Sequence, residues 1–367
     1  MTGRSALLDR LSPVPITMLV MAVYLGSILV RSGFDPYAFI RIGSQYQEEH
    51  AVDEQGYDGQ FVFFIARNTD PTSVAPLLDV PSYRYQRILL PLLGRLVALG
   101  LESAIPWALV LIGFASHALA VAVLTRLLAA WGLSRGYALI YGLFPGVLLA
   151  VRLALPEPLA YLFVVLALAA PEERRWQSWI CFAAAVFTKE TTLLFVGAQL
   201  LVYLARKDLP DFAGLTATAL IPFSLFQAWL FTQFGSLGLG SGGAMATAFE
   251  WIPFMGWLRI GAFGLLPLLV FGVVIVPFVY FPSIWGLVRT CRELVMRTFD
   301  VPAAVLFMNA LIVPFLPFST VREPGGLLRF VCGLVLAVLL YAAARQDRRA
   351  LNYGLLWIVL NAILIRS

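Results

Sequence analysis

Long apolar runs separated by short basic connections dominate this chain of 367 residues. A helix needs about 20 apolar residues to cross a hydrocarbon core of about 30 Å, and several of the runs reach that length. The runs predict helices over the segments 14–31, 104–130, 136–151, 155–170, 176–188, 190–205, 213–234, 258–287, 301–319, 325–344 and 350–365. We therefore expect one all-α domain over residues 1–367, a transmembrane bundle of about ten to eleven helices.

Composition supports a membrane protein. About 60% of the residues are hydrophobic, 13% are charged and the mean hydropathy is +0.85. A soluble fold of this size could not bury so much apolar surface. The net charge of +5 comes from basic residues scattered one or two at a time, so we expect no nucleic-acid partner. The three cysteines show neither metal-ligand spacing nor a disulfide framework.

The basic residues also predict the topology, because short cytoplasmic loops are enriched in Lys and Arg. We interpret the first run, from Val14 to Val30, as an uncleaved span, since no small-residue cleavage site follows it. With the N-terminus cytoplasmic, the inner turns carry Arg126, Arg135, Arg174, Arg175, Arg206, Lys207, Arg289, Arg292, Arg297, Arg345, Arg348 and Arg349. We expect a multi-pass protein of the cell (inner or plasma) membrane with its site on the extracytoplasmic face.

Residues 176–205 are either one long span or a hairpin of two short helices. A single crossing would put Arg206 and Lys207 on the outer side and invert every later span. The charge bias therefore favours a hairpin that turns at Thr188–Thr191.

The remaining charges collect at the predicted outer face. A charge at mid-membrane costs about 2.5–3.5 kcal/mol on insertion scales and persists mainly beside a polar cavity or a ligand. These residues are Asp58, Arg84, Arg87, Arg152, Glu157, Lys189, Glu190, Arg322, Glu323 and Arg329. Together they suggest a site for an anionic, membrane-borne substrate.

The long first outer loop, residues 32–103, contains the segment Gly56-Tyr57-Asp58-Gly59-Gln60-Phe61. Phe61, Phe64 and Ile65 have the spacing of a helix that lies on an apolar surface. Asp58 comes just before this helix, so it is either a helix N-cap or Asp-Gly turn, or a functional carboxylate.

A second segment of this loop, Tyr83-Arg84-Tyr85-Gln86-Arg87, precedes an apolar stretch that we interpret as an interfacial helix, Ile88–Leu101. The two arginines are three residues apart and share one helical face. They either snorkel beside an aromatic belt or form a guanidinium pair that grips a phosphate.

The pattern Tyr57-Asp58-Gly59-x-Phe61-x-x-x-Ile65-Ala66 resembles the Asp-bearing first-loop motif of the GT-C glycosyltransferases. It is similar to the Trp-Asp-x-x-x-[Phe/Tyr]-x-x-Ile-Ala pattern of the GPI mannosyltransferases and to bacterial GT-C-like membrane proteins. The resemblance is clearest over residues 14–235. The chain departs from the family in having Tyr57 in place of Trp, in lacking a strict Asp-x-Asp, and in lacking a large C-terminal outer domain. The second departure weakens any metal assignment, and the third makes a peptide acceptor less suitable.

The resemblance implies inverting transfer of a sugar from a polyprenyl-phosphate carrier to a hydroxyl acceptor, in cell-envelope polysaccharide or glycolipid assembly. It implies Asp58 as the general base, with a lipid-linked sugar, membrane lipid and a glycan or lipid acceptor as partners. Our candidates for binding the donor phosphate are Arg84, Arg87, Lys189, Arg322 and Arg329. Further substrate-binding candidates are Tyr57, Gln60, Tyr85, Arg152, Glu157 and Glu190. No cofactor is assigned, and Asp53 and Glu54 leave a weak divalent site open.

Other interpretations remain open. The pairs Arg152/Glu157, Lys189/Glu190 and Arg322/Glu323 could be structural ion pairs. Gly325 and Gly326 either cradle an anion or only follow a helix-starting proline. Gly238, Gly240 and Gly243 match G-x-G-x-x-G, but no strand precedes them, so we expect a mobile outer loop over 235–257. The competing functions are a transporter or flippase for a lipid-linked or anionic substrate, and a non-catalytic membrane scaffold.

Overall fold

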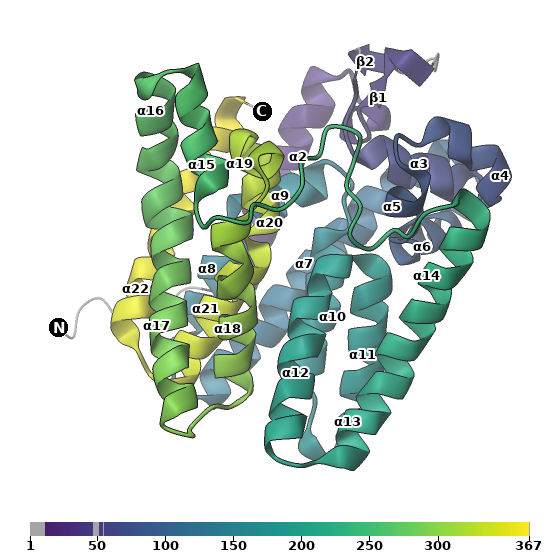
Figure 1. Ribbon diagram of the computed structural model, residues 1–367. Coiled ribbons are helices and arrows are strands. Elements are labelled where there is room, and N and C mark those ends of the chain that lie inside the picture. The colour runs from purple at the N-terminus through teal and green to yellow at the C-terminus, as the bar shows by residue number, and fades with distance from the viewer. Residues whose placement is uncertain (1–11, 47–50, 54, 367) are drawn as a thin grey trace.

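A computed structural model describes residues 12–46, 51–53 and 55–366 of this chain. Helices make up 78% of the structure and stand roughly side by side, as Figure 1 shows. The expected all-α bundle is therefore confirmed. The described residues do not include Glu54 or the side chain of Asp53, so the weak divalent site left open there lies outside the description.

The long connections are residues 32–58 and 235–254, but most helices follow one another with short connections. In chain order they are α2 (Pro13–Arg31), α3 (Gly59–Arg67), α4 (Pro71–Val74), α5 (Pro81–Tyr85), α6 (Leu89–Val97), α7 (Ile105–Ala130), α8 (Leu139–Gly142), α9 (Pro145–Arg152), α10 (Glu157–Ala169), α11 (Arg175–Thr188), α12 (Leu193–Ala205), α13 (Leu209–Leu215), α14 (Ile221–Phe234), α15 (Met255–Leu258), α16 (Leu265–Ile275), α17 (Phe281–Val295), α18 (Val301–Ile312), α19 (Phe318–Arg322), α20 (Pro324–Phe330), α21 (Cys332–Ala344) and α22 (Arg348–Gly354). Short 3₁₀ turns join several of them, and η12 (Leu355–Arg366) ends the described chain. The two strands, β1 (Ile42–Gly43) and β2 (Ala51–Asp53), pair in parallel.

Fewer helices are long enough to cross a membrane than the sequence predicted. Within the described residues, five meet the length and hydropathy of a span: Pro13–Arg31, Glu102–Ala130, Leu209–Phe234, Leu265–Val295 and Pro324–Ala344. The expected count of ten to eleven is not met, because many apolar runs fold as shorter pieces. The run 136–151, for example, breaks before Pro145. A helix of 13 residues such as α10 covers only about 20 Å.

Residues 176–205 form the hairpin that the charge bias favoured. α11 ends at Thr188, Lys189 is extended (φ −157°, ψ 124°), and α12 begins at Leu193. Arg175, at the start of α11, lies 2.7 Å from Asp208, just after the end of α12. The start of α11 and the end of α12 therefore lie at the same end of the bundle.

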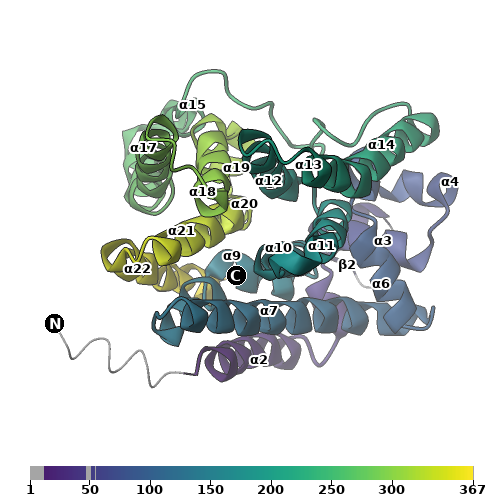
Figure 2. The ribbon, with the colours of Figure 1, turned by 90° about the horizontal axis from the view of Figure 1, so that it is seen from below.

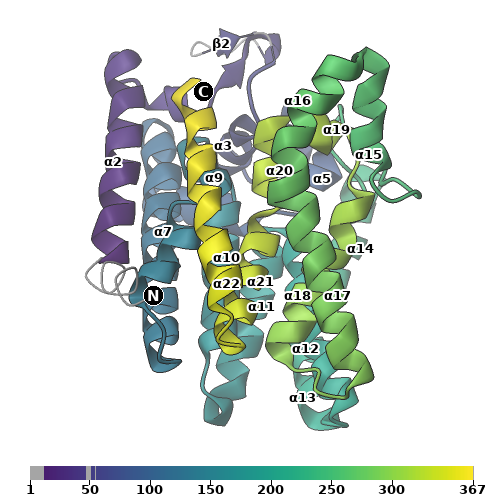
Figure 3. The same cartoon turned by 90° about the vertical axis from the view of Figure 1, so that its left-hand side faces the viewer.

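The spans differ in how deeply they are buried. For Pro324–Ala344, 89% of the apolar window is buried inside the protein, against 28% for α2 and for Leu265–Val295. α21 is thus a central helix, whereas α2, α16 and α17 lie at the edge, as the views in Figures 2 and 3 agree. The exposed apolar side chains of the edge helices suit contact with lipid.

The first loop folds over one end of the bundle, the upper end in Figure 1. It forms α3, α4, α5 and α6 together with the strand pair. α6 buries Leu90, Pro91 and Gly94 and leaves Leu92 and Leu96 exposed. The expected helix within 88–101 is therefore present, with one apolar face on the protein and another facing outward.

Candidate functional site

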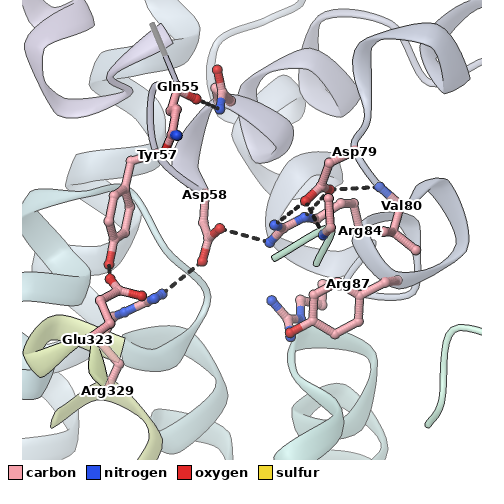
Figure 4. A network of polar contacts seen from close by, with 12 residues as sticks. Gln55, Tyr57, Asp58, Asp79, Val80, Arg84, Arg87, Glu323 and Arg329 are labelled. Carbon is pink, nitrogen blue, oxygen red and sulfur yellow. Dashed lines mark hydrogen bonds and ion pairs between the residues drawn. The ribbon is translucent and has the colours of Figure 1, made fainter. Parts of the chain in front are cut away.

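The carboxylate of Asp58 lies between two arginines from distant parts of the chain. Asp58 directly precedes α3, yet its side chain makes no cap hydrogen bond there. Instead, Oδ1 is 3.0 Å from Nη1 of Arg84, and Oδ2 is 3.2 Å from Nη1 of Arg329 (Figure 4). The N-cap interpretation is therefore wrong for the side chain, which is used for ion pairing.

Arg84, in α5, also forms a bidentate pair with Asp79. Its Nε and Nη2 donate to the two carboxylate oxygens of Asp79 at 2.7 and 2.8 Å (Figure 4). Its guanidinium carbon lies 4.2 Å from the centre of the Phe61 ring, and only 8% of its side chain is exposed. The sequence interpretation missed Asp79, because its local sequence is that of an ordinary loop aspartate.

Arg87 pairs with Glu190 across the bundle. Its Nε and Nη2 donate to the Glu190 carboxylate at 2.8 and 2.6 Å, and Nη2 also donates to the Tyr83 hydroxyl at 2.5 Å. Bidentate geometry fixes the guanidinium plane. Arg84 and Arg87 are therefore buried and engaged rather than snorkelling.

Glu157 is fully buried and lies between Lys189 and Arg329. Its Oε1 lies 2.7 Å from Nζ of Lys189 and 3.6 Å from Nη1 of Arg329. Within the described residues, its other oxygen, Oε2, has no hydrogen-bond partner. Glu157 begins α10, where the positive end of the helix dipole also favours a carboxylate.

We call these residues the Asp58 cluster: Asp58, Asp79, Arg84, Arg87, Glu157, Lys189, Glu190 and Arg329. Five segments contribute to it: the start of α3, α5 with its flanking residues, the start of α10, the hairpin turn after α11, and α20. Tyr57 and Glu323 border it: the Tyr57 hydroxyl donates to Glu323 at 2.6 Å, and the Arg329 guanidinium lies 5.1 Å from the Tyr57 ring (Figure 4).

The ion pairs set the charge state of the loop carboxylates. Burial alone would raise the pKa of Asp58, but the attraction of Arg84 and Arg329 outweighs it and holds that pKa well below its ordinary value. The pKa of Asp79 is lowered in the same way, against its burial, by its hydrogen bonds and attraction to Arg84. Asp58 is therefore an ionised carboxylate, and 30% of its side chain is exposed.

Four predicted site residues lie outside the cluster. Gln60 accepts from the Gly43 N–H at 2.9 Å and donates to the Gln55 carbonyl at 3.0 Å, so it ties α3 to β1. Tyr85 donates to the Thr69 carbonyl and packs on aromatic rings of α14. Arg152 donates to the Ala38 carbonyl at 3.1 Å. Arg322 is exposed and stacks on the Phe318 ring at 5.6 Å.

The ion pairs suggested by sequence neighbours have other partners. Lys189 and Glu190 adjoin in sequence but pair with Glu157 and Arg87 respectively. Glu323 accepts from Tyr57. Neighbours in the chain point to different sides of a tight turn, so sequence adjacency did not identify the partner.

The glycines near Glu323 serve helix packing. A Cβ on Gly325 would lie 3.1 Å from Leu149 and 3.4 Å from the Tyr57 hydroxyl, and one on Gly146 would lie 2.2 Å from the Leu328 carbonyl. They allow α9 and α20 to approach closely. A Cβ on Gly326 would lie 2.9 Å from the Glu323 carboxylate, so a carboxylate faces this glycine and its backbone does not cradle an anion.

The segment 235–254 crosses from α14 to α15 over the cluster (Figure 1). The Ala244 N–H donates to Asp79 at 3.0 Å, and the Thr247 N–H donates to the Ser319 hydroxyl at 3.0 Å. A Cβ on Gly243 would lie 2.7 Å from Nη2 of Arg84. This segment, which we call the strap, therefore links both sides of the cluster and packs directly on Arg84.

Comparisons with known proteins identify no relative: no protein-family model, curated protein or solved structure matches the chain. Within the described residues, no group of three His, Cys, Asp or Glu side chains is arranged to hold a metal ion.

Proposed function

We propose that this protein is a membrane glycosyltransferase that moves a sugar from a polyprenyl-phosphate carrier to a hydroxyl acceptor. Asp58 is the general base, and Arg84 and Arg329 bind the donor phosphate. The reaction is inverting and takes place on the extracytoplasmic face, in the assembly of envelope polysaccharide or glycolipid.

The observation that carries this proposal is the position of Asp58. Its carboxylate is partly exposed and lies within 3.2 Å of two guanidinium groups contributed by residues far apart in the chain. Charges buried in a membrane protein are costly to keep, so a cluster assembled from five separate segments favours a functional role. The same arrangement offers a proton acceptor beside two phosphate-binding cations.

The proposed chemistry balances with these groups alone. The acceptor oxygen forms a bond to the anomeric carbon while the bond from that carbon to the phosphate oxygen breaks. The proton of the acceptor hydroxyl passes to Asp58, and the bonding electrons leave with the lipid phosphate. Arg84 and Arg329 stabilise the negative charge that grows on the phosphate. One carboxylate is enough because the phosphate is already a good leaving group.

The ion pairs also couple base strength to donor binding. In the free protein both arginines lower the pKa of Asp58 and so weaken it as a base. A donor phosphate competes for the same guanidinium groups and draws their charge away from Asp58. The carboxylate then becomes more basic at the moment when the donor is in place.

A non-catalytic scaffold is favoured by one specific observation. In the described cluster each of the four cations, Arg84, Arg87, Lys189 and Arg329, already has a carboxylate partner. A purely structural cluster would be paired in the same way, so only activity separates the two functions.

The test is a transfer assay with the purified protein in liposomes that contain polyprenyl-phosphate sugars and a hydroxyl acceptor. The proposal predicts transfer by the wild type and a loss of about 10²- to 10⁴-fold for Asp58→Asn, as expected when a general base is removed. Asp70→Asn is the matched control, because Asp70 caps α4 and asparagine caps equally well. No transfer with any donor sugar would favour the scaffold, and donor movement across the bilayer without transfer would favour a flippase.

A further inference from the structure

An apolar cavity of about 170 Å³ lies between α16, α20 and η12. Figure 3 shows α20 between the other two elements. Its lining is apolar throughout and includes Phe144, Val274, Phe278, Leu327 and Trp357. An apolar cavity of about 150 Å³ stays dry and holds a benzene ring, so this one can hold a short piece of hydrocarbon.

The cavity opens toward the lipid-facing surface. Val270, which lines it, is 58% exposed, and its neighbours Leu269 and Val273 on α16 are 56% and 72% exposed. α16 belongs to one of the five candidate membrane spans. A hydrocarbon chain can therefore enter sideways from the bilayer, without crossing water.

The cavity and the Asp58 cluster lie on opposite faces of helix α20. Pro324, Leu327, Leu328 and Val331 have i, i+3, i+4, i+7 spacing and line the cavity. Arg329 lies on the opposite face of the helix and pairs with Asp58. A ligand would pass from one face of α20 to the other around the start of this helix, at Pro324.

The cationic residue Arg322 lies just before the start of α20. Arg322 immediately follows Val321, which lines the cavity, and precedes Glu323 at the border of the cluster. Arg322 is exposed, and the contact that the structure gives it is the Phe318 ring. Among the described residues it forms no ion pair, so its guanidinium is available to a phosphate.

We infer that this cavity binds part of the hydrocarbon chain of the lipid-phosphate substrate while Arg322 binds its phosphate at the entrance to the Asp58 cluster, before the phosphate reaches Arg84 and Arg329. The identity of the lipid as substrate rests on the proposed function. The apolar cavity and the position of Arg322 do not depend on that function. Apolar lining selects hydrocarbon, the lipid-facing mouth gives the bilayer as its source, and the adjacent arginine selects an anionic headgroup.

The test uses farnesyl phosphate with a photoreactive diazirine at the far end of its chain, added to the protein in nanodiscs of neutral lipid. We expect crosslinks on peptides of α16 and η12. Val274→Trp fills the cavity and should lower this crosslinking at least about fivefold, as a lost hydrophobic contact of 1–2 kcal/mol implies. Val273→Trp is the matched control: it adds the same ring one residue away, where Val273 faces outward, and should change crosslinking less than about twofold.

The headgroup arm compares farnesyl phosphate with uncharged farnesol. Arg322→Gln should weaken binding of the phosphate about tenfold, the cost of losing a hydrogen bond to a charged group, while leaving farnesol unchanged. Arg322→Lys should restore most of the affinity. Equal effects on both probes would overturn the role of Arg322.

Three results would overturn the inference as a whole. They are crosslinks that map elsewhere, equal crosslinking by the two tryptophan variants, and complete displacement of the probe by an equimolar anionic phospholipid. These readouts do not depend on sugar transfer. Crosslinking in the cavity without any sugar transfer would support the inference and contradict the proposed function. Normal transfer kinetics in Val274→Trp would support the proposed function and contradict the inference.

Discussion

The two ends of the bundle hold similar ion pairs in different surroundings. At the end opposite the first loop, Arg345 makes bidentate pairs with Glu293 and Asp300 at 2.7–2.9 Å, and Tyr341 donates to Glu293 (Figure 1). The side chains of these three charged residues are 16–34% exposed. In the Asp58 cluster the exposure is 0% for Glu157 and 8% for Lys189 and Arg84, and only Asp58 among these four is as exposed, at 30%.

We interpret the exposed pairs at the far end as structural, and we propose that the buried pairs of the Asp58 cluster serve the function. Pairs near water add little stability and close the turns between neighbouring helices. Buried pairs lose much of their attraction to desolvation, and apolar residues of the same volume often replace them without loss of stability. We therefore propose that the buried cluster serves to bind a ligand.

Breaking one buried pair and one exposed pair gives the largest contrast. We expect Lys189→Met to reduce the free energy of unfolding by about 3–5 kcal/mol, because it leaves the Glu157 carboxylate buried without its cation. Arg175→Met, at the other end, should cost about 1 kcal/mol or less, because 41% of the Arg175 side chain is exposed. Thermal unfolding in detergent measures both, and equal losses would contradict the distinction between the two ends.

The strap gives a prediction of intermediate size. Gly243→Ala puts a methyl group 2.7 Å from Nη2 of Arg84, which its pairs with Asp58 and Asp79 hold in place. We expect a loss of about 1–3 kcal/mol in unfolding free energy from overpacking, together with reduced transfer. Gly26→Ala is the matched control, since no atom lies within 4 Å of its added Cβ. Unchanged stability and transfer in Gly243→Ala would show that the strap does not press on Arg84.

Acid should loosen the first-loop end through Asp58. Its pKa is lowered in the folded state, so its pairing stabilises the protein above the ordinary aspartate pKa of about 3.9 and is lost as the pH falls below it. The melting temperature of the wild type should therefore fall more between pH 5 and about pH 3 than that of Asp58→Asn. Parallel curves for the two proteins would contradict the lowered pKa.

The smallest effect is expected for an exposed pair at the far end. Arg289 lies 3.4 Å from Asp347 and 43% of its side chain is exposed. Arg289→Gln should change the free energy of unfolding by less than about 0.5 kcal/mol. A loss comparable to that of Lys189→Met, measured in the same detergent, would remove the contrast between the two ends.

The sequence predicted the fold class and the membrane character because these follow from apolar periodicity and length. It overestimated the number of spans, because hydropathy does not register where a run breaks into short helices, as it does before Pro145. The charge bias resolved the hairpin at Lys189 correctly, because topology depends on which side each basic turn occupies.

The sequence predicted which residues belong to the site better than it predicted which of them contact one another. Charges placed on one face by topology alone, such as Asp58, Arg84 and Arg329, do meet. Asp79 was missed because nothing in the local pattern distinguishes it from a loop aspartate. Gln60 was assigned to substrate although its partners are backbone groups, which a residue pattern does not reveal.

The most direct test compares two carboxylates that share one arginine. Asp58→Asn and Asp79→Asn each remove an anionic partner of Arg84, but only the first removes the proposed base. Rates of sugar transfer from a polyprenyl-phosphate donor should fall at least about 100-fold for Asp58→Asn and less than about tenfold for Asp79→Asn. Equal losses in the two variants, or normal transfer by Asp58→Asn, would contradict the account.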